Sequence, residues 1–140
     1  MNDSLKSCVL AGMLSASACV ANAADSALIL GKSSYNANCA ICHGEDGKGT
    51  GSVAELFRVP PSDLTTLAER AGGAFPFSEA YQAIASGLGE KAHGESEMPI
   101  WGGFFVADAL EDRGVSAQDA QHIVQGRILS LVYYLESIQE

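Results

Sequence analysis

The stretch Cys39–His43 constrains this chain more than any other, because it reads Cys-Ala-Ile-Cys-His, a C-x-x-C-H string. This string is typical of a covalent attachment site for a c-type haem. Each thiol can add to one vinyl group of the haem, and the histidine that follows supplies a neutral imidazole, a good ligand for iron. The motif therefore predicts Cys39 and Cys42 as attachment residues and His43 as an axial ligand.

Two other kinds of site share the C-x-x-C spacing. A zinc site could be built from the three ligating side chains of the motif together with His93. However, adjacent ligands such as Cys42 and His43 close a tetrahedron poorly, and a structural zinc site usually has a second spaced pair of ligands. A thioredoxin-like thiol pair is expected beside a βαβ pattern, which the sequence lacks. Haem is therefore the favoured interpretation.

The beginning of the chain has the features of a secretory signal peptide. Lys6 supplies a weakly positive start, residues 8–21 are apolar or small and uncharged, and Ala21-Asn22-Ala23 is a small-x-small cleavage site. The apolar run is too short for a comfortable transmembrane helix. We predict a signal peptide over residues 1–23, export to the periplasm, and a single mature domain over residues 24–140.

Two alternatives to this cleaved peptide are disfavoured: a buried amino-terminal helix, and a lipoprotein signal that uses Cys19. The second is weakened because Ala16 stands where such signals usually have leucine. Cleavage would leave Cys39 and Cys42 as the only cysteines of the mature chain and Met98 as its only methionine.

The charge of the chain limits its partners. Its 140 residues fit one domain, and 8 Lys+Arg against 17 Asp+Glu give a formal net charge of −9. Such an acidic chain is a poor candidate for binding nucleic acid or an anionic membrane surface. A redox partner with a basic docking surface is favoured, although the charge could also serve solubility alone. No stable membrane span is expected in the mature chain.

Helical periodicity without β-type alternation predicts an all-α fold. The predicted helices run from about Ala27 to Cys39, from Asp63 to the Gly72–Gly73 pair, from Glu79 to Ser86, from Phe104 to Leu110 and from Ala117 to about Ser137, with a short helical turn over residues 53–57. Ser62, Ser78 and Ser116 are the predicted N-caps, and Asp119 completes a capping box with Ser116. Four glycines over residues 44–52 predict a loop.

Two features of these helices concern packing. Glycine inside a helix costs about 1 kcal/mol relative to alanine, so Gly31 is predicted to permit the close approach of another helix. The last helix has a predicted apolar face, formed by Ile123, Ile128, Leu131, Tyr134, Leu135 and Ile138.

An electron-carrying haem iron usually has two axial ligands, and Met98 is the favoured second one. A methionine is normally core filler, but Met98 lies in a predicted loop that Pro99 stiffens. His93 and an open site remain alternatives, whereas His122 falls inside the last predicted helix. Thioether ligation favours ferrous iron and hence a positive reduction potential. With both axial sites filled dioxygen has no free position, which indicates an electron carrier and not an enzyme.

The chain resembles the class I monohaem cytochromes c, small bacterial periplasmic proteins, over nearly all of residues 24–140. The residues that match are Gly31 and Tyr35 before the motif, Gly44, Asp46, Gly47 and Gly49 after it, Met98-Pro99 downstream, and Leu131–Leu135 in the closing helix. The resemblance implies one haem with thioether bonds to Cys39 and Cys42, His43 as the proximal ligand and Met98 as the distal ligand. It also implies a fold of short helices around the haem in which the first and last helices cross.

The sequence departs from the family pattern at two places. Many members have a proline soon after the glycine-rich loop, and its carbonyl orients the proximal histidine; here Ser52 follows Gly51, so the group that orients His43 is open. The segment Gly103–Ser116 is longer than in the smallest members, and it either packs over the haem edge or meets a partner.

Together these features predict a periplasmic protein that carries one electron on a covalently bound haem c. Two alternatives remain. One is a haem-c subunit of a larger oxidoreductase, in which a partner performs the chemistry. The other is a haem enzyme or gas sensor with a labile distal site.

Overall fold

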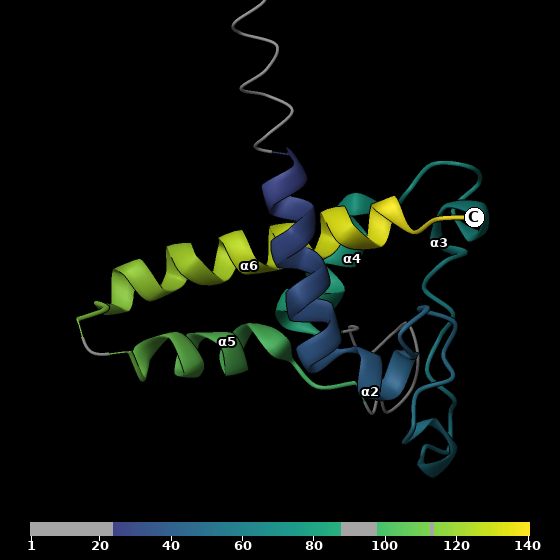
Figure 1. The fold of residues 1–140 in the computed structure, drawn as a ribbon, viewed down its shortest axis with the longest axis horizontal. Helices are drawn as coiled ribbons and strands as arrows, with labels where there is room; N and C mark the ends of the chain where they lie inside the picture. Colours follow the sequence, from purple (N-terminus) through teal and green to yellow (C-terminus); the bar gives the residue numbers. More distant parts are fainter. Residues whose placement is uncertain (1–23, 88–97, 113) are drawn as a thin grey trace, which may run out of the picture.

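The computed structural model describes residues 24–87, 98–112 and 114–140, and these residues contain helices but no strand, which confirms the all-α class. The elements are the N-terminal helix (residues 24–38), α2 (Ala40–His43), the 3-10 helix η1 (Ala54–Leu56), α3 (Leu67–Arg70), α4 (Phe77–Ser86), α5 (Trp101–Leu110) and α6 (Ala117–Ser137) (Figure 1). None of the described helices is both long and apolar enough to cross a membrane. The predicted signal peptide, residues 1–23, and His93 lie outside the described residues.

Helix α6 is the longest element and begins at the predicted N-cap, Ser116, although Asp119 bonds to the Ser116 hydroxyl and not to its backbone amide as in a full capping box. The Asp119 amide donates to Ser116 Oγ (3.1 Å), and the Ser116 hydroxyl donates to Asp119 Oδ2 (2.7 Å). Its buried apolar residues are Ala120, Val124, Ile128, Leu131, Val132, Tyr134 and Leu135. Ile123, which the periodicity places on this face, is 44% exposed, because the neighbouring Val124 takes the inward position. Helix α6 therefore supplies most of the buried residues of the hydrophobic core.

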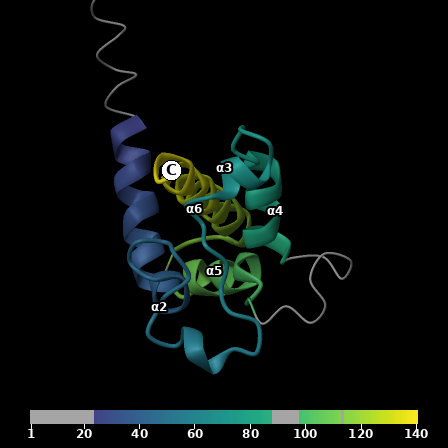
Figure 2. The same ribbon diagram turned by 90° about the vertical axis from the view of Figure 1, so that its right-hand side faces the viewer.

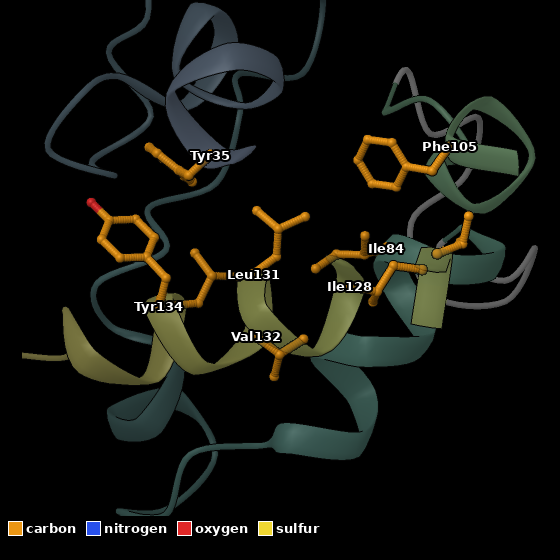
Figure 3. Packing of buried hydrophobic residues seen from close by; sticks show 9 residues of the cluster. Tyr35, Ile84, Phe105, Ile128, Leu131, Val132 and Tyr134 are labelled. Carbon is orange, nitrogen blue, oxygen red and sulfur yellow. The ribbon is translucent and has the colours of Figure 1, made fainter. Parts of the chain in front are cut away.

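The N-terminal helix crosses α6 at Gly31, as predicted (Figure 1 and Figure 2). A Cβ atom on Gly31 would overlap the Ser130 carbonyl oxygen and would lie 2.8 Å from Tyr134 Cβ. Tyr35, one turn later, is fully buried, and its ring centroid lies 5.2 Å from that of Tyr134 (Figure 3). The missing side chain of Gly31 lets the two helix backbones touch.

Helices α4 and α5 pack on α6 and on each other. Ile84 from α4 and Phe105 from α5 are buried in the same core cluster as the apolar face of α6 (Figure 3). The Arg127 guanidinium lies 4.9 Å from the centroid of the Phe105 ring and forms an ion pair with Asp108 (2.7 Å). Much of the long segment Gly103–Ser116 is thus a helix that joins the core.

Candidate functional site

The motif stands where the N-terminal helix meets α2. The Cys39 amide donates to the Tyr35 carbonyl (2.8 Å) and the His43 amide donates to the Cys39 carbonyl (2.9 Å), so helical bonding continues through the motif. Cys39 and Cys42 are free, partly buried thiols. Burial, and secondarily the neighbouring Cys42, raises the pKa of Cys39 to about 12. This thiol is therefore protonated at neutral pH.

The predicted glycine-rich loop folds back onto the motif. The Gly49 amide donates to the His43 carbonyl (2.7 Å), and the Gly51 amide donates to the Cys42 carbonyl (3.0 Å). These bonds satisfy carbonyl groups that the end of α2 leaves free. Position 51 requires glycine, because a Cβ atom there would overlap the Ile41 carbonyl oxygen. The loop thus fixes the end of α2 that holds His43.

Tyr35 connects the N-terminal helix to the residue that follows the motif. Its hydroxyl group is buried and donates to the Gly44 carbonyl oxygen (2.7 Å). Burial raises the pKa of Tyr35 far above its ordinary value, so the hydroxyl group stays protonated and can donate at any physiological pH.

We expect Tyr35→Phe to lower the free energy of unfolding by about 0.5–1.5 kcal/mol, because the buried Gly44 carbonyl would lose the hydrogen bond from Tyr35 and keep only the one from the Gly47 amide (3.2 Å). Chemical denaturation of the haem-loaded protein measures this loss. Tyr133→Phe is the control: Tyr133 is 47% exposed, and this change should stay within about 0.5 kcal/mol of the wild type. Equal stability of the two variants would contradict the role given to Tyr35.

The imidazole of His43 is oriented by a backbone carbonyl. His43 Nδ1 lies 2.9 Å from the Ser62 carbonyl oxygen. A carbonyl can only accept, so Nδ1 carries the proton and the lone pair of Nε2 is left for a metal. Burial lowers the pKa of His43, while the bond to Ser62 opposes this shift. The ring is therefore neutral at neutral pH, which is the form that binds iron.

The Ser62 carbonyl is available because no helix begins there. The helix predicted from this region is wrong in extent: only Leu67–Arg70 is helical. Instead, Asp63 Oδ1 accepts from the Thr65 amide (2.8 Å) and from the Thr65 hydroxyl (2.7 Å), which forms a local turn. The role of Ser62 does not follow from the sequence pattern, although the two prolines before it already disfavour a helix on that side.

Met98 lies at the start of the segment that leads into α5. It is partly buried and packs against the same core cluster as Cys39. Cys39 and Met98, two of the four predicted site residues, are therefore distant in the sequence but pack against the same hydrophobic core. His122 is exposed on α6, as expected of an ordinary helical residue. His93, the other alternative ligand, is outside the described residues.

The donor set suits a c-type haem. It comprises two free thiols three residues apart, an imidazole with its Nδ1 already bonded, and a partly buried thioether. Imidazole and thioether are both ligands of haem iron. Over residues 24–87, 98–112 and 114–140, no cluster of three or more His, Cys, Asp or Glu side chains is arranged to hold a metal ion.

Comparisons with known proteins agree with this chemistry. Residues 28–125, more than half of the chain, match the family model described as Cytochrome c. No curated protein and no solved structure matches the chain. The matched range contains the C-x-x-C-H motif and Met98.

Proposed function

Because the chain belongs to the cytochrome c family, whose members bind haem c covalently, we propose that it is a periplasmic carrier of single electrons. In this proposal Cys39 and Cys42 form the thioether bonds, and His43 and Met98 are the axial ligands. The observation that supports it most strongly is the bond between His43 Nδ1 and the Ser62 carbonyl, since it prepares Nε2 to bind iron directly beside two free thiols.

The proposed roles of the four residues differ. The two cysteines would hold the haem in place, and His43 would ligate its iron in the neutral, oriented form described above. Met98 would supply a soft thioether to the iron, which favours the ferrous state. Cys39 and Met98 both pack against the apolar core cluster. The bound haem supplies the one-electron couple.

The attachment residues can be tested by replacing Cys39 and Cys42 together with alanine. After denaturation and acidic solvent extraction, mass spectrometry should find one haem on the wild-type polypeptide and none on the double variant. Met98→Ala is the matched control, because it should alter ligation but keep the haem bound covalently. Haem that stays on the double variant, or leaves the wild type, would contradict the proposed attachment.

The acidic chain, with its net charge of −9, should attract cationic redox partners. We expect the rate of oxidation by a cationic cobalt(III) complex to fall by about tenfold or more between low and high salt, because the Debye length shrinks from about 30 Å at 0.01 M to below 10 Å above 0.1 M. Oxidation by ferricyanide, an anion, should instead become faster with salt. Stopped-flow rates that are flat for both reagents would count against electrostatic docking.

A further inference from the structure

The last two residues of the chain fold onto the segment that follows Ser62. Gln139 Oε1 accepts from the Ala68 amide (2.9 Å), while Gln139 Nε2 donates to the carbonyls of Leu64 (2.8 Å) and Leu135 (2.6 Å). One side chain therefore bridges the C-terminal part of α6 and residues 64–68, with all three bonds to backbone groups.

Leu64 is held at both of its backbone polar groups. Its carbonyl accepts from Gln139, and its amide donates to the Gly47 carbonyl (2.7 Å). The segment over residues 57–66 has no regular secondary structure. The backbone there is held by the turn of Asp63 and Thr65, by the Arg70 guanidinium, which donates to the Asp63 carbonyl (2.6 Å), and by the long-range bonds of Leu64. Ser62, whose carbonyl contacts His43 Nδ1, lies only two residues before Leu64.

The neighbouring Glu140 contributes differently. Its amide donates to the Thr65 carbonyl (2.9 Å), and its carboxylate pairs with Lys48 (2.7 Å). Both side chains of this ion pair are exposed, at 44% for Lys48 and 60% for Glu140. Such pairs contribute little, so the Gln139 side chain is the principal connection between the tail and the segment.

We propose that Gln139 is a positioning residue that holds residues 64–68 on α6, so that the Ser62 carbonyl keeps its hydrogen bond to His43. This inference rests on the proposed function, because it matters only if His43 ligates the iron. A hydrogen bond from the ring nitrogen that does not bind the metal fixes the orientation of a ligating histidine and increases the basicity of the ring. Greater basicity favours ferric iron, so a loosened bond should shift the reduction potential upward.

The test compares the haem-loaded wild type with Gln139→Leu, which removes all three bonds at similar volume. We expect a more positive reduction potential and altered paramagnetic NMR resonances of the His43 ring. Ser116→Ala is the matched control: it removes the N-cap at the other end of α6 and should lower stability without moving the potential or these resonances. Glu140→Gln, which keeps the backbone bond to Thr65, should also leave both unchanged.

Gln139→Leu with lowered stability but wild-type potential and His43 resonances would overturn the proposal. If that variant fails to fold, Gln139→Glu replaces it, because it keeps the acceptor for Ala68 but cannot donate to Leu64; an unchanged potential there would be equally damaging. Failure of the proposed function looks different: the His43 ring of the wild type itself would then lack the large paramagnetic shifts of an iron ligand.

Discussion

Gly31→Ala should destabilise the folded protein by about 1–3 kcal/mol, the usual cost of overpacking, even though alanine is the better helix former. The added Cβ atom would overlap the Ser130 carbonyl oxygen and lie 2.8 Å from Tyr134 Cβ. A backbone carbonyl in α6 cannot turn away as a flexible side chain could. The two helices must therefore separate, which also disturbs the packing of Tyr35 against Tyr134.

Gly126→Ala is the matched control for this prediction. Gly126 lies within α6 and is exposed, and a Cβ atom added to it would meet no atom of a neighbouring element within 4 Å. The change should therefore stabilise the protein by up to about 1 kcal/mol, through helix propensity alone. Thermal or chemical unfolding of the two haem-loaded variants gives both values. A Gly31→Ala variant as stable as Gly126→Ala would contradict the close crossing of the helices.

Met98→Ala has the largest expected effect on the redox properties. Loss of the thioether would remove the ligand that favours ferrous iron, so the reduction potential should fall. The variant should also lose the long-wavelength absorption band of methionine-ligated ferric haem and, when reduced, bind carbon monoxide. Potentiometry and absorption spectroscopy measure these changes.

Ile100→Ala is the control for Met98, since Ile100 lies two residues away in the same segment and is 60% exposed. It should keep the wild-type potential, the long-wavelength band and the inertness to carbon monoxide. A Met98→Ala variant that is spectroscopically identical to Ile100→Ala would rule out Met98 as a ligand and turn attention to His93.

The parts of the fold that could be predicted depend on local signals. The start of α6 follows from the N-cap Ser116, and the crossing follows from a glycine in the middle of a helix. The register error at Ile123 has a simple cause: two adjacent apolar residues compete for one inward position, and Val124 occupies it. Packing against other elements decides such a choice, and the local pattern does not.

The parts that could not be predicted depend on long-range contacts. The local pattern predicts Ser62 as an N-cap, yet its carbonyl bonds to His43, and its neighbour Asp63 forms the local turn. Gln139 reaches residues 64–68 from the other end of the chain. Local periodicity cannot predict contacts between distant residues, so only the structure identifies the Ser62 carbonyl as the group that orients His43.

The most direct test of the proposed haem ligation is the absorption spectrum of the purified wild-type protein, recorded in the oxidised state and then in the reduced state with and without carbon monoxide. If His43 and Met98 both ligate the iron of a covalent haem, the oxidised protein shows the long-wavelength band and the reduced spectrum does not change with carbon monoxide. Ready binding of carbon monoxide by the reduced protein, without that band, would contradict the carrier and favour a haem enzyme or gas sensor with an open distal site.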